Sequence, residues 1–142
     1  MVGANNLPLS NCTLREAYSE LVLSHPYREA LVVHTTGRRV TFATLGEDAD
    51  IVARMLGLHY GQLLANWLSN CEAWVVLLLA CARRGVVVVA LGLEYRAPEL
   101  LHALRLSGAD ILVNYPVAVV CRCTLSRLLS LFARDVGSQT LS

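Results

Sequence analysis

The stretch CEAWVVLLLACARRGVVVVALGL, residues 71–93, decides the fold class of this chain. It is apolar over a length that could cross a lipid bilayer. Arg83 and Arg84 lie at its centre, however, and each would cost about 2.5–3.5 kcal/mol there on membrane-insertion scales. Gly85 and the valines that follow it favour a change from helix to strand. The sequence therefore predicts no transmembrane segment, but a buried helix followed by a buried strand over 86–91.

The flanking segments repeat this alternation of helix and strand. Residues 63–67, LLANW, form a short apolar run before the helix, and residues 110–114 form another after the strand. Helices are predicted over 41–57 and 98–106, between or before these runs. Such an alternating order is typical of a parallel sheet with crossover helices. The strand over 86–91 has no polar alternation, which is typical of a parallel strand covered on both faces. The predicted fold class is α/β, mainly a parallel sheet with flanking helices.

The N-terminal part is predicted to be a helix and a hairpin. Thr13 and Glu16 form a capping box, in which each side chain satisfies the other residue's free backbone N–H group. The helix that they start ends at His25-Pro26, because the residue before a proline is pushed out of the α region. Two short strands, over 30–34 and 39–41, then pair as a hairpin.

Polar residues predict where the later helices begin. Thr41 or Thr44 is placed to cap the helix over 41–57. Asn70 is placed to cap the helix over 71–84, since an amide oxygen can accept from the first free N–H groups of a helix.

The chain divides into three segments by sequence character. Residues 1–12 are an irregular lead-in, and residues 13–114 are the α/β part. Residues 115–142 form a divergent tail without a recognisable motif. In this tail, 117–120 is compatible with one more strand, and the apolar spacing is compatible with an amphipathic helix over 124–134 that turns Leu125, Leu128, Leu129 and Phe132 to one side.

Composition excludes some functions and leaves others open. Hydrophobic residues make up 55% of the chain and charged residues 16%, which fits either a fragment with a face meant for a missing neighbour or a small domain with a covered sheet. The net charge of +1 gives no basic footprint for nucleic acid. All 12 basic residues are arginine, so the chain has no lysine.

Neither secretion nor metal binding is indicated. The first 12 residues lack the basic and apolar regions of a secretory signal, so we expect an intracellular protein, cytoplasmic or organellar. The five cysteines have no framework spacing, and Cys121-Arg122-Cys123 lacks the second pair that a zinc site needs. The four histidines are scattered, so no metal site is predicted.

Short motifs in a fixed order carry the most specific information. They are His25-Pro26-x-Arg28-Glu29-Ala30-Leu31-Val32, Arg39-Val40-Thr41-Phe42-x-x-Leu45, Gly57-Leu58-x-x-Gly61, Trp67-x-x-Asn70, Trp74 and Ala80 with Gly85 and its valine run, and Glu99-Leu100 with Leu104 and Ser107-Gly108-Ala109. In this order they resemble the N-terminal part of the adenylate-forming enzymes, the AMP-dependent synthetase/ligase family, of the acyl-CoA synthetase type. The resemblance covers residues 13–113 and implies that the fold is an incomplete N-terminal portion of that family's large domain.

The resemblance implies a reaction whose machinery these residues lack. Family members make an acyl-adenylate from a carboxylate and ATP with Mg²⁺, and then pass the acyl group to coenzyme A. Their phosphate loop, T-S-G-T-T-G-x-P-K, has no counterpart here, and no lysine exists to grip the carboxylate and phosphate. Gln62-Leu63 and Gly92-Leu93 also depart from the family's usual Asp-Arg and Asn-Pro. We expect a truncated family member with no catalytic residue and no cofactor bound by this chain itself; ATP, Mg²⁺ and CoA are implied for the full enzyme.

Three residues are binding candidates by their place in the resemblance. Arg83 matches a family arginine that approaches coenzyme A phosphates, and a guanidinium suits phosphate through its fork of donors. Asn70 and Trp74 lie near the start of the family's acyl or pantetheine tunnel. We favour the structural alternatives: a charge at the negative end of a helix dipole for Arg83, a helix cap for Asn70 and a core aromatic for Trp74.

Two other functions remain as alternatives. The chain could be a non-catalytic interaction module, a pseudoenzyme that pairs through an apolar face with a full-length relative or with the missing remainder of the enzyme. The high apolar content and the segment 124–134 favour this alternative. A free-standing nucleotide-binding α/β protein is disfavoured, because no glycine-rich loop joins a strand to a helix.

Overall fold

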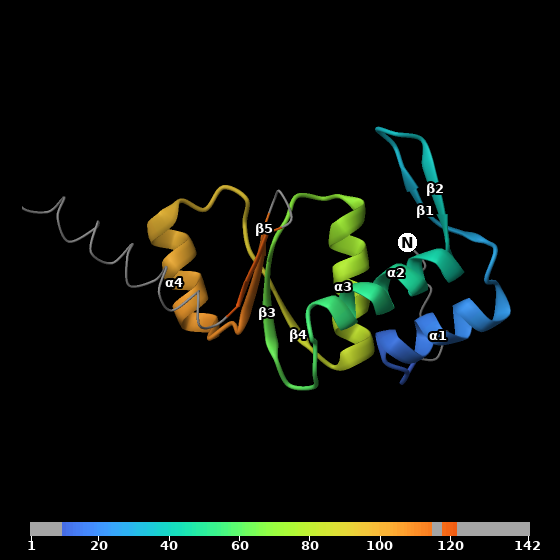
Figure 1. Ribbon diagram of the computed structural model, residues 1–142, viewed down its shortest axis with the longest axis horizontal. Coiled ribbons are helices and arrows are strands. Elements are labelled where there is room, and N and C mark those ends of the chain that lie inside the picture. Colours follow the sequence, from blue (N-terminus) through green and yellow to red (C-terminus); the bar gives the residue numbers. More distant parts are fainter. Residues whose placement is uncertain (1–9, 115–117, 122–142) are drawn as a thin grey trace, which may run out of the picture.

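A four-stranded sheet forms the centre of the molecule (Figure 1). The computed structural model describes residues 10–114 and 118–121. In sheet order, the strands are β4 (Val87–Ala90), β3 (Leu63–Trp67), β5 (Ile111–Asn114) and β6 (Ala118–Cys121). β3 runs parallel to both β4 and β5, and β6 is an antiparallel partner of β5. The predicted α/β class with a mainly parallel sheet is confirmed.

Helices cover both faces of this sheet. They are α1 (Leu14–Ser24), α2 (Phe42–Met55), α3 (Glu72–Arg84) and α4 (Ala97–Ser107). α3 lies on one face with α2 and α1 beyond it, and α4 lies on the other (Figure 1). Successive strand residues point to opposite faces, so Leu64 enters the core with α2 and α3 while Ala65 enters the core with α4. The two hydrophobic cores therefore share β3.

The predicted hairpin forms a separate two-stranded unit. β1 (Glu29–Val33) and β2 (Arg38–Thr41) pair in antiparallel fashion, and Val33 lies opposite Arg38 beside the turn. The hairpin projects from the side of the molecule that carries α1 and α2 (Figure 1). It connects α1 to α2, and Thr41 at its end is also the first residue before α2.

The chain passes from helix α3 to strand β4 at Gly85, as the sequence predicts. Gly85 has a φ of 68°, in the left-handed region that glycine adopts without a Cβ clash. Its N–H group donates to the Ala82 carbonyl oxygen, which closes the last turn of α3. Among the described residues, no helix is long and apolar enough to cross a membrane.

The valine strand is less covered than its sequence predicts. Its apolar run predicts a strand covered on both faces, but β4 lies at the sheet edge of the described strands, and Val87 is 53% exposed. β3 takes the covered central place instead. An apolar run shows that burial of the strand would be favourable. How many strands lie beside it depends on the topology of the whole sheet. β4 thus presents an apolar edge to its surroundings.

The helix starts agree with two of the predicted caps. Thr13 and Glu16 form their capping box, with the Thr13 N–H donating to Glu16 Oε2 at 2.7 Å and the Glu16 N–H to Thr13 Oγ1 at 3.2 Å. Hydrogen bonds from the Thr13 backbone and side chain lower the pKa of Glu16, because they stabilise its charged form. Of the two threonines proposed for α2, Thr41 is the cap, accepting from the Thr44 N–H at 3.2 Å.

The tail lies mostly beyond the described residues. β6, Ala118–Cys121, overlaps the strand suggested over 117–120. The helix predicted over 124–134 lies outside the described residues, as do residues 1–9 of the lead-in.

We predict that the shared strand controls the stability of the whole molecule. Leu64→Ala should lower the free energy of unfolding by about 2–5 kcal/mol, because it opens a cavity where no solvent reaches. Leu106→Ala is the matched control: Leu106 is 79% exposed on α4, and its truncation should change stability by no more than about 0.5 kcal/mol. Urea unfolding followed by circular dichroism measures both, and equal effects would contradict the central role of β3.

Candidate functional site

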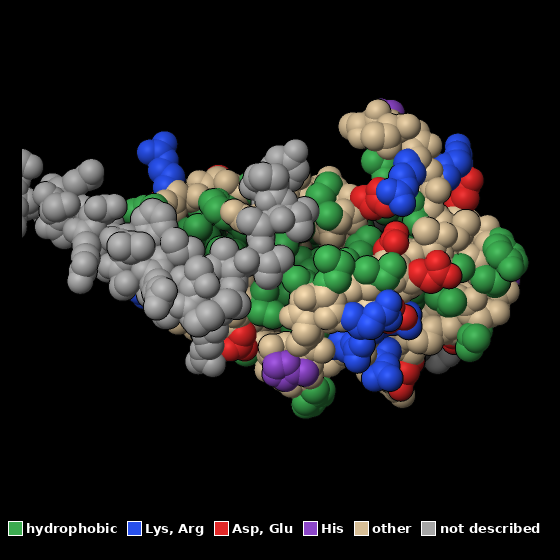
Figure 2. Space-filling view, viewed as in Figure 1, with side chains coloured by type: hydrophobic (Ala, Val, Ile, Leu, Met, Phe, Trp, Pro, Cys, Tyr) green, Lys and Arg blue, Asp and Glu red, His purple; other side chains and the backbone are tan. Residues whose placement is uncertain are grey.

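An apolar groove lies between α2, α3 and the end of β5. Its apolar lining includes Ile51, Val52, Met55, Leu68, Val76 and Val113, and its volume is about 690 Å³. Met55 is 79% exposed and Ile51 45% exposed. Figure 2 shows apolar side chains gathered on this face of the molecule, with charged side chains beside them. We call this recess the apolar groove.

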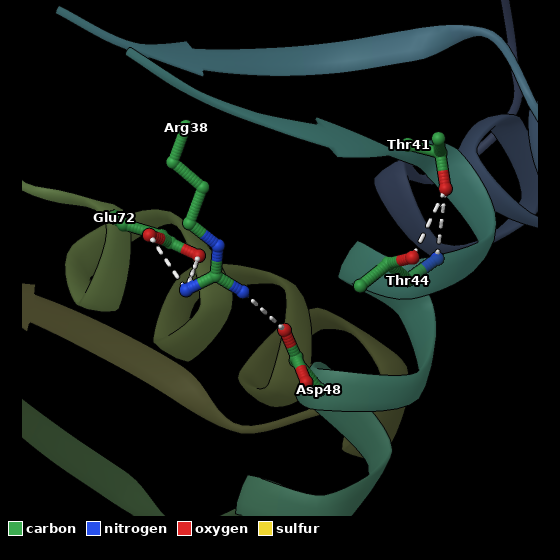
Figure 3. A network of polar contacts seen from close by, with 5 residues as sticks. All are labelled: Arg38, Thr41, Thr44, Asp48 and Glu72. Atoms are coloured by element: carbon green, nitrogen blue, oxygen red, sulfur yellow. Dashed lines mark hydrogen bonds and ion pairs between the residues drawn. The ribbon is translucent and has the colours of Figure 1, made fainter. Parts of the chain in front are cut away.

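Both charged residues that line the apolar groove are acidic. Asp48 comes from α2 and Glu72 from the first turn of α3. Arg38 reaches over from β2 and contacts both, with its Nη1 3.1 Å from a Glu72 oxygen and its Nη2 4.0 Å from Asp48 (Figure 3). These exposed pairs are each worth about 0–1 kcal/mol. They link the hairpin to the two helices and leave the rim with one more carboxylate than guanidinium.

A second, polar pocket of about 300 Å³ surrounds the C-terminal end of α3. It is lined by Arg15, Ser19, Asp50, Arg83 and Arg84. Arg83 Nη2 donates to Asp50 Oδ2 at 2.8 Å, so the candidate coenzyme A arginine is already paired with a carboxylate of α2. Two further arginines, Arg15 and Arg84, line the same pocket beside this pair. A role for Arg83 toward coenzyme A stays a prediction.

Asn70 does not cap α3. The cap position is Cys71, whose extended backbone directly precedes the helix, and no side chain accepts a hydrogen bond there. Asn70 is exposed one residue earlier, too far from the free N–H groups that a cap must meet. The predicted cap at Asn70 was therefore wrong. A role for Asn70 in binding an acyl group or pantetheine stays a prediction.

Trp74 packs as a partly buried aromatic against the core that α2 and α3 share. It lies in the first turn of α3, near Asn70. Arg83 lies nine residues further along the same helix, a rise of about 14 Å. The structure therefore separates the three candidate binding residues into two groups at opposite ends of α3.

Sequence reasoning missed two asparagines at the carboxyl ends of the parallel strands. Asn66, on β3, is 1% exposed; its Oδ1 accepts from the Leu68 N–H at 3.2 Å, but its Nδ2 has no partner among the described residues. Asn114, at the end of the neighbouring β5, likewise has a buried Oδ1 without a partner in the described part. Ligands of open α/β sheets bind at this end. A polar residue inside the apolar run LLANW was the signal that could have pointed to Asn66.

The described residues offer little reactive chemistry. Burial raises the pKa of the Cys81 thiol to about 11, so this cysteine remains a protonated, inert core residue at neutral pH. No three His, Cys, Asp or Glu residues in the described part are grouped so that they could hold a metal ion. The arrangement can bind apolar surface in the apolar groove and pair charges at its rim and in the polar pocket.

Residues 20–140 match the family model of the AMP-binding enzymes. The chain belongs to the AMP-binding enzyme family. The predicted adenylate-forming family is therefore confirmed, together with the N-terminal place of this segment within it.

The relatives of this AMP-binding family member are much longer proteins. The mitochondrial medium-chain acyl-CoA ligase ACSF2 of Bos taurus is 40% identical over 114 residues, which are 78% of this chain and 18% of the relative. The acyl-CoA ligase sidI of Aspergillus fumigatus is 34% identical over 107 residues, 73% of this chain and 18% of the relative. The chain thus spans about a fifth of the length of these proteins.

Solved structures share the same fold at low sequence identity. The N-terminal subdomain of Klebsiella oxytoca NpsA, in complex with anthranilyl-AMSN, matches 72% of this AMP-binding family member with a TM-score of 0.66 and 22% identity, and 27% of that chain is covered. A Mycobacterium tuberculosis fatty acyl CoA synthetase matches 72% of this chain with a TM-score of 0.64 and 24% identity, and 21% of that chain is covered. These likenesses concern the fold alone.

The corrected cap assignment can be tested with a pair of substitutions. We expect Thr41→Ala to lower the free energy of unfolding by about 1 kcal/mol, because Thr41 satisfies a free N–H group at the start of α2. Asn70→Ala should change it by less than about 0.5 kcal/mol, because Asn70 is exposed and does not cap α3. Chemical denaturation of the two variants measures the difference. A loss at Asn70 equal to that at Thr41 would restore the rejected cap.

Proposed function

We propose that this chain supplies the N-terminal part of the large domain of an acyl-CoA ligase for medium-chain carboxylates. The single observation that carries the proposal is the 40% identity to a medium-chain acyl-CoA ligase over a segment that is 18% of that enzyme. We further propose that the 142 residues alone do not form an acyl-adenylate. In this proposal ATP, Mg²⁺ and CoA act in the complete enzyme, which is intracellular, in an organelle or in the cytoplasm.

The chemistry of the residues present supports the inactivity of the isolated chain. Adenylation requires a phosphate cradle and positive charge held beside the reacting phosphate. The chain has no lysine and no Ser/Thr/Gly-rich loop of the family kind. Its best-placed guanidinium for a phosphate, that of Arg83, is paired with Asp50. The described residues therefore act as a scaffold rather than as a catalytic centre.

Two assays test whether this chain is a scaffold without catalytic activity of its own. The pure 142-residue chain should give no ATP–pyrophosphate exchange with octanoate above the blank, whereas the Bos taurus relative provides the positive control. A chimera in which residues 13–114 of this chain replace the matching segment of that relative should make octanoyl-CoA with a kcat within about tenfold of the parent, a change of less than about 1.4 kcal/mol.

Each assay tests one half of the proposal. Exchange by the isolated chain would contradict its inactivity. A chimera that folds and binds ATP but forms no octanoyl-CoA would contradict the scaffold role, because the segment would then fail to support the chemistry of its relatives.

A second candidate is a non-catalytic module that pairs with a full-length relative. The observation that favours it is the apolar edge strand β4, where Val87 is half-exposed and β3 is the one described neighbour. An exposed strand edge presents free backbone N–H and C=O groups that another strand can pair with.

Substitution at the edge distinguishes this candidate. If β4 is the contact, Val87→Lys should weaken capture of the full-length Bos taurus relative about tenfold, because a charge at a strand edge opposes pairing. Leu106→Lys, on exposed α4, should leave capture unchanged. Binding is measured by surface plasmon resonance with the immobilised relative. No binding by the unsubstituted chain would exclude this candidate.

A further inference from the structure

Positive charge exceeds negative charge in the polar pocket at the C-terminal end of α3. Three guanidinium groups line this pocket, that of Arg15 on α1 and those of Arg83 and Arg84 on α3. The one carboxylate in the lining is that of Asp50 on α2, and it pairs with Arg83. Arg15 and Arg84 form no salt bridge within the described part of the chain. The lining of the pocket therefore carries an excess of two positive charges.

The position of Arg15 is unfavourable for a positive charge. It lies in the first turn of α1, where the helix dipole favours negative side chains over positive ones. The acidic residue of that turn, Glu16, is held by Thr13 in the capping box, and the hydrogen bonds of Thr13 lower the pKa of Glu16 more than the charge of Arg15 does. Like charges in one pocket repel each other, and an anion between them would remove this cost.

The guanidinium of Arg83 is fixed in place and still has donors for a ligand. Its Nη2 donates to Asp50 Oδ2 at 2.8 Å, and a guanidinium carries further N–H donors besides this one. Its Nη1 lies against Gly46 of α2, where an added Cβ would be 3.6 Å away. The hydroxyl of Ser19 already donates to the Arg15 carbonyl oxygen at 2.8 Å. The donors that remain for a ligand in the pocket are therefore guanidinium N–H groups.

Several guanidinium groups around one polar recess suit a phosphate. A planar guanidinium can donate two parallel hydrogen bonds to two phosphate oxygens, which gives direction as well as attraction. The two negative charges of a phosphate dianion also equal the excess positive charge of the lining. The volume of about 300 Å³ lies at the lower end of the range for small-molecule pockets, which favours a small anion over a whole nucleotide.

The polar pocket lies away from the edge of the sheet where ligands of open α/β sheets bind, which is the carboxyl end of the strands. α3 leads from the carboxyl end of β3 back to the amino end of β4, so its C-terminal end lies at the opposite edge. The first turn of α1 lies beside this end of α3 (Figure 1). Because a helix of 13 residues is about 20 Å long, about that distance separates the pocket from the carboxyl edge.

We propose that the polar pocket binds a free phosphate dianion, at a site separate from the carboxyl end of the sheet. Arg83 is the fixed member of this site, and Arg15 and Arg84 complete it from α1 and from the end of α3. The bound anion joins the two helices through their guanidinium groups and relieves the repulsion between them. The proposal does not depend on the proposed function, because it rests on the charges and hydrogen bonds of the pocket alone.

Titration of the full 142-residue chain with inorganic phosphate tests the proposal. Isothermal titration calorimetry measures the dissociation constant at neutral pH and constant ionic strength, because salt screens exposed charges. The test variant carries Arg15→Gln and Arg84→Gln, and both side chains are exposed, so the fold should be kept. The matched control carries Arg96→Gln and Arg105→Gln, which remove the same charge from exposed positions at α4, on the other face of the sheet.

We expect the Arg15→Gln, Arg84→Gln variant to bind phosphate at least about tenfold more weakly than the unsubstituted chain, because it loses two charge-assisted donors. The control variant should stay within about twofold of the unsubstituted chain, because its charges are remote. Equal affinity of the two variants, or no phosphate binding by the unsubstituted chain, would overturn the proposal.

A second variant should change the affinity in the opposite direction. Asp50→Asn removes the carboxylate that competes for Arg83, so phosphate should bind at least about threefold more tightly. A loss of structure cannot produce tighter binding, so this measurement stands even if the arginine variants fail to fold. Unchanged or weaker binding by the Asp50→Asn variant would overturn the proposal.

Coenzyme A and dephospho-coenzyme A, which lacks the ribose phosphate, distinguish a free phosphate from a phosphate carried by the coenzyme. For a site that takes free phosphate, the two coenzymes should bind within about twofold of each other. Binding of coenzyme A at least about tenfold more tightly than of dephospho-coenzyme A, with the difference lost in the Arg15→Gln, Arg84→Gln variant, would overturn the proposal. It would assign these arginines to the coenzyme instead.

Discussion

Strand β3 is the constraint on which the rest of the molecule depends. It is hydrogen-bonded on both sides, to β4 and β5, and both of its faces are covered by helices. Its alternating side chains therefore enter two separate cores, and Leu64 and Ala65 are fully buried within them. The buried Asn66 lies on the same strand, so the polar group at the carboxyl end of the sheet is fixed by the same packing.

Arginines join the peripheral elements to this centre. Arg38 connects the hairpin to α2 and α3, and Arg83 connects the end of α3 to Asp50 of α2. Arginine suits these contacts because its planar guanidinium offers several donors in fixed directions. α2 and α3 share a hydrophobic core, with the apolar groove near the N-terminal end of α3 and the polar pocket near its C-terminal end.

The chain belongs to the AMP-binding family but spans only about a fifth of the length of its relatives. This explains which of the family's features are present and which are not. The sheet and helices of the family's N-terminal part are present, whereas its phosphate loop and lysine have no counterpart in these residues. Apolar surface remains at the β4 edge and in the apolar groove.

The sequence by itself determined the family, the alternation of helices and strands, and the helix start at Thr13, because motif order, periodicity and capping are local properties of the chain. Only the tertiary structure decided that β3 rather than the valine strand is central, that Asn70 caps nothing and that Arg83 pairs with Asp50. The physical reason is that strand order and charge pairing join residues far apart in the chain. Asp50 is 33 residues from Arg83, and hydrophobicity shows that a segment prefers burial without showing which neighbours bury it.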